Sequence, residues 1–200
     1  TRRRFRPPVG SQPARGILEP VAAPDGGVVF AALGDLWWLA PGGRLRQLTD
    51  DPAVERDPAF SPDGASLAFI GDRGGSMQVW RREVATGIDR MLTRMPRGVR
   101  YPTFAPDSQS LAFQQAGPCG NQDFTVHRLD LKSTVITPIK APPLWPGRMG
   151  FSADGQRLLV AVLTSRSARF REGRNVLKAI DVETGASATV DLPARLTTDT

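Results

Sequence analysis

The sequence of this 200-residue chain predicts an all-β fold, a β-propeller made of four-stranded antiparallel blades. Two repeated turns predict it: a Pro-Asp-Gly turn followed by a short apolar run, and a Thr-Gly turn inside an alternating run. Both recur at spacings of about 40–50 residues, which is the length of a propeller blade. In addition, apolar residues spaced three and four apart nowhere continue far enough to make a helix. Four blades are visible, and we interpret them as part of a larger ring.

The chain divides into a tail and four repeat units. Residues 1–16 contain several prolines and glycines and are expected to form an extended tail. The propeller segment covers 17–200. Its four blades are expected at about 17–55, 56–98, 99–144 and 145–197.

The first repeated turn joins the first and second strands of each blade. Proline presets the first corner, aspartate bonds to its own backbone, and glycine takes the positive φ that closes the hairpin. In the third and fourth copies Ser108 stands for the glycine and Ala153 for the proline, so these two turns are less well specified. We interpret the turn residues as structural rather than as ligands of a cation: Asp25, Gly26, Asp63, Gly64, Asp107, Asp154 and Gly155.

The second unit shows how four strands fit into one blade. Its first strand ends at Phe60, and the Pro-Asp-Gly turn leads to a second strand over 66–70. The third strand, over 77–84, alternates between two faces. The Thr-Gly turn then leads to a fourth strand over 89–93. The copies of this second turn are Ala85-Thr86-Gly87, Lys132-Ser133-Thr134 and Glu183-Thr184-Gly185.

The net charge of +6 is concentrated in the tail, because residues 1–15 hold five arginines and no acidic residue. The rest of the chain is nearly neutral and does not predict a nucleic-acid groove, which needs clustered Lys and Arg on the folded face. We interpret the tail as a linker or arm, with phosphate binding as the alternative. No window reaches 18 uninterrupted apolar residues, so no transmembrane helix is predicted.

Catalytic and metal chemistry is not predicted. One cysteine and one histidine cannot supply a structural zinc site or an internal disulfide, and no Gly-x-Ser-x-Gly motif occurs. His127 holds the place in the repeat that Trp80 and Lys178 hold, which indicates a half-exposed third strand. Cys119 is flanked by loop formers. The nearest approach to a calcium loop is the acidic group Asp50, Asp51, Glu55 and Asp57, on a connection between blades. We therefore expect no catalytic residue, no cofactor and no metal.

Loop lengths indicate where the propeller binds a partner. In an up-and-down blade the second-to-third loops and the blade connections share one face, and here these are the long segments: 71–76, 115–122, 164–174 and 138–147. Loops on a rigid scaffold carry function, although these loops could also simply fill space. The segment 164–174 is rich in arginine around an aromatic residue, a composition enriched in binding hot spots, with a solvated loop as the alternative. The candidate partner-binding residues are Arg166, Arg169, Phe170, Arg171, Arg174 and Trp145.

The repeat resembles that of TolB-like propellers. The resemblance rests on the run from Asp57 to Phe69, followed by Gly71-Asp72-Arg73-Gly74-Gly75, and continues to the Leu92-Thr93 pair. Shorter matches, at 30–37, 46–49 and 170–175, are similar to the propeller part of bacterial amidohydrolase-fusion proteins.

The resemblance implies a ring of about six blades and an extracytoplasmic, periplasmic or secreted location. It implies a non-catalytic binding or scaffolding domain that is accessory to a larger bacterial hydrolase of the amidohydrolase or peptidase type. The alternative is a free-standing propeller of the cell envelope that binds other proteins. In both cases the implied partner is a protein, and no nucleic-acid partner is implied.

Overall fold

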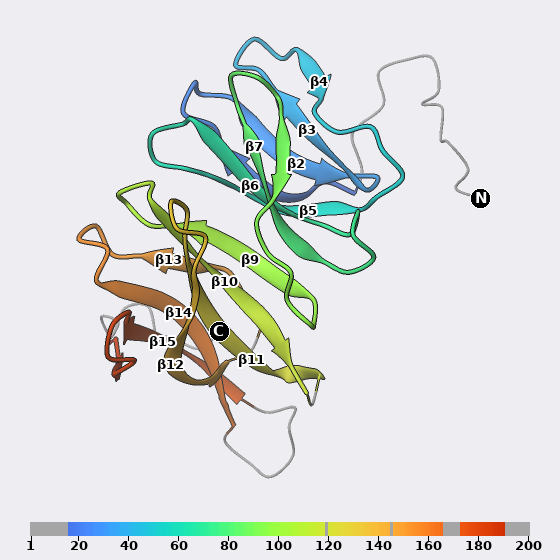
Figure 1. Cartoon of the computed structure of the whole chain (residues 1–200). Helices are drawn as coiled ribbons and strands as arrows, with labels where there is room; N and C mark the ends of the chain where they lie inside the picture. Colours follow the sequence, from blue (N-terminus) through green and yellow to red (C-terminus); the bar gives the residue numbers. More distant parts are fainter. Residues whose placement is uncertain (1–15, 119, 145, 166–172, 191–200) are drawn as a thin grey trace.

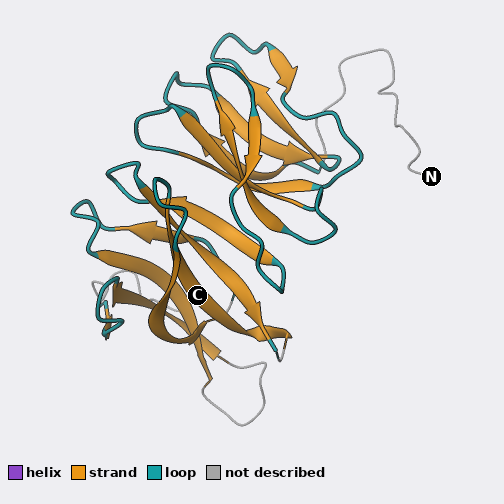
Figure 2. Cartoon of the chain, in the orientation of Figure 1, coloured by secondary structure: helices purple, strands orange, loops and turns teal. Residues whose placement is uncertain are grey.

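The computed structural model describes residues 16–118, 120–144, 146–165 and 173–190. These residues form sixteen strands in four separate four-stranded antiparallel sheets, each with its strands in chain order (Figure 1). No helix occurs in these four ranges (Figure 2), so none of the described elements is a helix that could cross a membrane. The predicted all-β propeller with four visible blades is confirmed.

The strands of each blade follow one another closely in the sequence. Blade 1 contains β1 (Leu18–Ala22), β2 (Val28–Ala32), β3 (Asp35–Leu39) and β4 (Leu45–Gln47). Blade 2 contains β5 (Glu55–Phe60), β6 (Ser66–Gly71), β7 (Gln78–Glu83) and β8 (Asp89–Met91). Blade 3 contains β9 (Val99–Phe104), β10 (Ser110–Gly117), β11 (Gly120–Asp130) and β12 (Ile136–Leu144). Blade 4 contains β13 (Met149–Phe151), β14 (Arg157–Ser165), β15 (Gly173–Asp181) and β16 (Ser187–Thr189).

The Pro-Asp-Gly turn closes the first hairpin of each blade, as the sequence predicts. In blade 2 the Gly64 N–H donates to the Ser61 carbonyl at 2.9 Å, and the Ser61 N–H donates to the Ser66 carbonyl. Pro62 therefore occupies the first corner, and Pro24 and Pro106 occupy the same corner in blades 1 and 3. The third copy works without glycine because its serine takes a φ of 58°.

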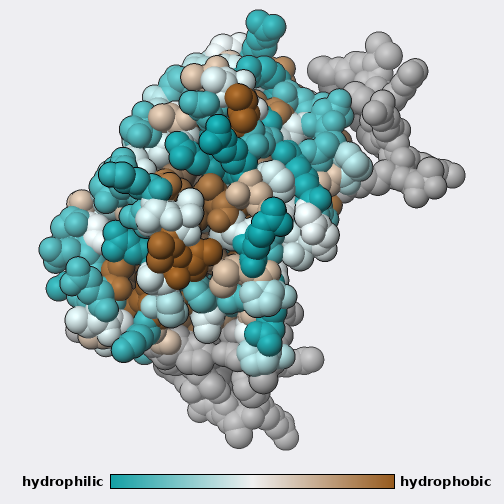
Figure 3. All heavy atoms as spheres, viewed as in Figure 1, coloured by the Kyte–Doolittle hydropathy of each residue, from teal (hydrophilic) through white to brown (hydrophobic). Residues whose placement is uncertain are grey.

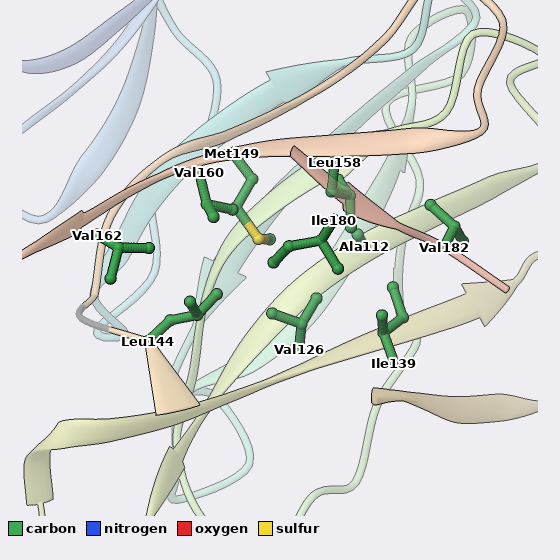
Figure 4. Packing of buried hydrophobic residues seen from close by; sticks show 10 residues of the cluster. All are labelled: Ala112, Val126, Ile139, Leu144, Met149, Leu158, Val160, Val162, Ile180 and Val182. Atoms are coloured by element: carbon green, nitrogen blue, oxygen red, sulfur yellow. The ribbon is translucent and has the colours of Figure 1, made fainter. Parts of the chain in front are cut away.

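The hydrophobic core lies between the blades rather than inside any one of them. Along β6, Leu67 and Phe69 pack toward blade 1, whereas Ala68 and Ile70 pack toward blade 3. A third cluster joins blades 3 and 4 (Figure 4). The first strands of successive blades contact one another, β1 with β5, β5 with β9 and β9 with β13, so they form the inner side of the blade stack.

Three of the four predicted long loops are shorter than predicted, because paired strands extend into them. β10 and β11 pair as far as Gly117 and Gly120, which makes most of 115–122 a hairpin. β14 and β15 pair as far as Ser165 and Gly173. Backbone ladders pair whatever side chains they carry, so the side chains of these segments do not show where the pairing ends.

The predicted connection over 138–147 is also largely strand, because β12 continues to Leu144. Pro138 pairs with His127 in that strand. β12 is the outermost strand of its sheet, and an edge strand tolerates proline because its missing N–H need not serve a further neighbour. Only the segment 71–76 is a loop for nearly its whole predicted length.

Candidate functional site: the axial cluster and the loop-face pocket

Each antiparallel blade has a turn face and a loop face. The turn face carries the β1–β2 type and β3–β4 type hairpin turns, and the loop face carries the second-to-third loops and the connections between blades. The candidate site lies on the loop face, at the inner strands of blades 1 to 3. Most of the surface in Figure 3 is hydrophilic, with hydrophobic patches near the middle of the view, where the first and second pairs of blades meet.

The first strands of blades 1, 2 and 3 each contain a β-bulge with one residue in the left-handed region. These residues are Glu19, Asp57 and Tyr101, with φ values of 55°, 51° and 53°. Each stands five residues before the proline position of its turn, so the three are equivalent in the repeat. Non-glycine residues in this conformation cost on the order of 1–3 kcal/mol each and persist only where the surroundings hold them.

Carboxylates of one blade hold the bulged backbone of the next. The Asp57 N–H donates to Oε2 of Glu19 at 2.5 Å, and the Tyr101 N–H donates to Oδ2 of Asp57 at 3.3 Å. Arg100 completes the group, with Nε 3.5 Å from Oδ2 of Asp57 and Nη2 4.0 Å from Oε1 of Glu19. Its guanidinium lies 4.6 Å from the centre of the Tyr101 ring. We name Glu19, Asp57, Arg100 and Tyr101 the axial cluster; it connects three blades.

The pKa values of the two carboxyl groups of the axial cluster are shifted in opposite directions. Asp57 is 1% exposed, and burial raises its pKa to about 6, with the Glu19 carboxylate adding to the rise and Arg100 opposing it. Burial also acts to raise the pKa of Glu19, but hydrogen bonds from Asp57 and the charges of Arg148 and Arg56 outweigh it and lower that pKa. Among the described residues, Oδ1 of Asp57 and Nε of Arg56 are buried without a hydrogen-bond partner. Asp57 is therefore the carboxyl group of this pair that takes up a proton first, as the pH falls through about 6.

A pocket of about 420 Å³ adjoins the axial cluster between blades 2 and 3. Its walls come from the segment before β7, the start of β9, the β10–β11 hairpin and the connection to blade 4. All these segments belong to the loop face. One lining residue is charged, Arg100, and the others are apolar or glycine: Met77, Gly98, Val99, Ala116, Phe124 and Pro146.

A second charged group joins blade 2 to the connection from blade 1. Arg73 binds three carboxylates, with Nε 2.7 Å from Asp51 and 3.3 Å from Glu55, and Nη1 2.8 Å from Asp89. Its guanidinium also lies 5.0 Å from the centre of the Trp80 ring. Burial raises the pKa of Glu55 to about 7, and the nearby Asp51 charge adds to that rise. Because every member already has a partner, we interpret this group as structural.

The turn aspartates each bind their own turn. A carboxylate oxygen of Asp25 accepts the N–H two residues later at 2.9 Å, as do those of Asp63 at 3.0 Å, Asp107 at 2.9 Å and Asp154 at 2.9 Å. They lie in separate hairpins on the turn face. Among the described residues no group of three His, Cys, Asp or Glu side chains is arranged to hold a metal.

His127 lies on the third strand of blade 3, where the repeat places it. It pairs with Phe113, as Trp80 pairs with Phe69 and Lys178 with Val160. The ring stacks on Phe113 at 5.5 Å, and burial lowers its pKa.

The predicted partner-binding residues cannot be placed in the same way. The residues outside the described part include Arg166, Arg169, Phe170, Arg171 and Trp145. They also include Cys119 and residues 1–15 of the tail predicted over 1–16. The backbone of Arg174 pairs with Thr164 in the β14–β15 hairpin, and its side chain lies outside the described part.

Sequence reasoning missed the axial cluster and the pocket. The sequence does contain a sign of the cluster, because Glu19, Asp57 and Tyr101 each stand the same number of residues before the repeated turn. The residue types differ from copy to copy, however, and their common feature is a backbone conformation.

The comparisons with known proteins agree with this architecture. No protein-family model matches the chain. The TolB homologue of Chlorobium luteolum is 37% identical over 57 residues, which cover 28% of this chain and 13% of that protein. The Tol-Pal system protein TolB of Bordetella pertussis is 38% identical over 48 residues, or 24% of this chain and 10% of that protein. The chain thus matches only a small part of the length of these curated relatives.

Solved structures resemble the chain over most of its length. TolB from Acinetobacter baumannii superimposes with a TM-score of 0.71 at 21% identity, covering 87% of this chain and 43% of that one. A puromycin-hydrolyzing peptidase of Mycobacterium tuberculosis superimposes with a TM-score of 0.65 at 14% identity, covering 88% of this chain and 29% of that one. At such identities the likeness concerns the fold, and the fold is that of a TolB-like β-propeller.

Proposed function

We propose that this chain is a non-catalytic propeller segment that binds protein through its loop face, as an accessory part of a larger bacterial hydrolase outside the cytoplasm. The observation that carries the proposal is the apolar pocket beside the axial cluster. There an open, mostly apolar surface lies on rigid strands from several blades, which is where propeller-like scaffolds present binding sites. The likeness to a peptidase that carries such a propeller supports the accessory role.

A free-standing envelope propeller is the second candidate. The segments that are 37–38% identical to TolB proteins favour it. The coding sequence downstream of Thr200 discriminates the two, because the accessory role requires an adjoining catalytic domain with its own metal ligands or nucleophile. A stop soon after ring closure would support the free-standing propeller instead.

We propose further that additional blades complete the ring, to about six. Leu159 and Leu177 of blade 4 occupy the repeat positions that Ala112 and Val126 hold in blade 3. In blade 3 those residues pack against the next blade. Because blade 4 presents leucines at the same positions, its outer face is suited to the same kind of contact.

The binding proposal is tested by placing a charge on each face in turn. Met77→Arg puts a cation into the loop-face pocket, and Val135→Arg puts the same charge on the turn face, where Val135 is 54% exposed. We expect the first variant to weaken association with the adjoining domain, measured with separately purified parts, and the second to leave it unchanged. Equal effects from both variants would contradict binding through the loop face.

The arginine-rich segment over 164–174 is proposed as a second contact with the same partner. Arginine suits carboxylate recognition because its planar fork of donors matches the two oxygens. Replacing Arg169 and Arg171 together with alanine should weaken the association and reduce its dependence on salt. Unchanged association would remove the segment from the interface.

A further inference from the structure

We propose that the loop-face pocket receives the C-terminal residue of a partner chain, with its apolar side chain inside the pocket and its free carboxylate on Arg100. This inference rests on the proposed protein-binding function and specifies the part of the partner that is recognised.

The lining selects an apolar group that carries one negative charge. Met77, Val99, Ala116 and Phe124 provide an apolar wall, and Arg100 is the one charged residue among those that line the pocket. An apolar side chain gains from leaving water, and a carboxylate gains a charge-assisted hydrogen bond from the guanidinium. A ligand without the carboxylate would leave the guanidinium facing an uncharged group.

Arg100 has hydrogen-bonding capacity to spare. Its contacts with Asp57 and Glu19 are 3.5 and 4.0 Å long, whereas Arg82 binds Asp89 at 2.7 and 2.9 Å. Its side chain remains 30% exposed, compared with 13% for Arg82. A guanidinium carries five N–H donors, so Arg100 can bind a ligand carboxylate without first breaking short ion pairs.

The pocket has room for the last residue of a chain. About 420 Å³ is near the lower end of the usual range for ligand sites. In a C-terminal residue the carboxylate and the side chain are attached to the same carbon. Val99 and Arg100 of β9 both line the pocket, so a ligand inside it lies near an apolar residue and near a charged one.

The axial cluster links this site to pH. Five charged groups from four segments act on one another here: Glu19 of β1, Asp57 and Arg56 of β5, Arg100 of β9, and Arg148 before β13. While Asp57 is ionised, its charge repels a ligand carboxylate bound to Arg100. When Asp57 takes up a proton as the pH falls through about 6, this repulsion ends, and the ligand should bind more tightly.

The probe is the tripeptide N-acetyl-Ala-Leu-Phe, used as the free acid and as its C-terminal amide, and titrated into the full chain by NMR. We expect the acid to shift the amide signals of Gly98, Val99 and Ala116, and to bind at least about tenfold more tightly than the amide. N-acetyl-Asp-Phe-amide, whose only carboxylate is on a side chain, should bind as weakly as the amide. Equal binding of acid and amide, or shifts at other sites, would overturn the proposal.

Variants of the chain separate the cation from the apolar wall. Arg100→Gln should lower the affinity for the acid to that for the amide, and Arg100→Lys should restore part of it. Arg90→Gln, at an exposed arginine of β8, is the matched control and should have no effect. If Arg100→Gln fails to fold, Ala116→Phe, which fills the pocket without altering the axial cluster, should abolish binding of the acid instead.

The pH arm compares the wild type with Asp57→Asn. Between pH 8 and pH 5 the wild type should gain affinity for the acid, and the variant should bind it equally well at both. If the tripeptide does not bind but Met77→Arg still weakens association with the adjoining domain, the C-terminal site is wrong and the proposed function stands. If Met77→Arg also has no effect, both are wrong.

Discussion

The contact between blade 4 and blade 3 can be tested by substituting two glycines that are equivalent in the repeat, Gly185 and Gly87. Gly185 in the β15–β16 turn has a φ of 72°, and its N–H donates to the Asp181 carbonyl at 2.9 Å. Gly87 in the β7–β8 turn has a φ of 71° and donates to the Glu83 carbonyl at 2.8 Å. The two turns therefore have the same local geometry.

Their surroundings differ. A Cβ added at Gly185 would overlap the backbone carbonyl of Lys140 in β12, well inside van der Waals contact. A Cβ added at Gly87 would meet no atom within 4 Å. Alanine in the left-handed region costs about 1–2 kcal/mol at either position, and forced overlap in a packed region adds about 1–3 kcal/mol.

We therefore expect Gly87→Ala to lower the free energy of unfolding by about 1–2 kcal/mol and Gly185→Ala by about 2–5 kcal/mol. Urea denaturation followed by tryptophan fluorescence and circular dichroism measures both. The difference between the variants isolates the contact between blades, because the backbone term is common to them. Equal losses would show that the last turn of blade 4 does not lie against β12, and the packing of these blades would have to be revised.

Three other predictions use the same unfolding measurement. Asp57 has a folded pKa raised to about 6, so the stability that it contributes is complete below its unfolded pKa of about 4 and is lost as the pH rises through 6. The free energy of unfolding of the wild type should therefore decline between pH 4 and pH 7, and Asp57→Asn should make that decline smaller by about 2–3 kcal/mol. If the variant and the wild type showed the same pH dependence of stability, the raised pKa of Asp57 would be refuted. Thr134, which takes a φ of 59° where two other blades have glycine, should stabilise the protein by about 1 kcal/mol when changed to glycine; a loss of stability would mean that its hydroxyl matters more. Phe69→Ala, at a fully buried position, should cost about 3–5 kcal/mol, whereas Leu33→Ala, at a position that is 70% exposed, should stay within about 0.5 kcal/mol.

Local chemistry made the blades predictable. The Pro-Asp-Gly turn specifies its own hairpin because proline, aspartate and the residue at positive φ act within four successive residues. The alternating runs beside it specify which side chains face a neighbouring blade, as Leu67 and Ala68 do on opposite faces of β6. The position of His127 followed from the same repeat, because its equivalents in other blades are easily counted.

Strand ends and the candidate site depended on contacts between distant residues. The β10–β11 hairpin continues through polar residues because each backbone N–H and C=O finds a partner on the opposite strand, and side-chain polarity does not report that partner. From the sequence alone, Asp57 is interpreted as one of several acidic residues on a connection between blades. Only the tertiary structure places it beside Glu19 of one blade and Arg100 of another, and only that burial raises its pKa. Sequence alone determined the repeat, since turns are local. The stacking of three blades decided the site, because its hydrogen bonds between blades join residues that are 38 and 44 positions apart along the chain.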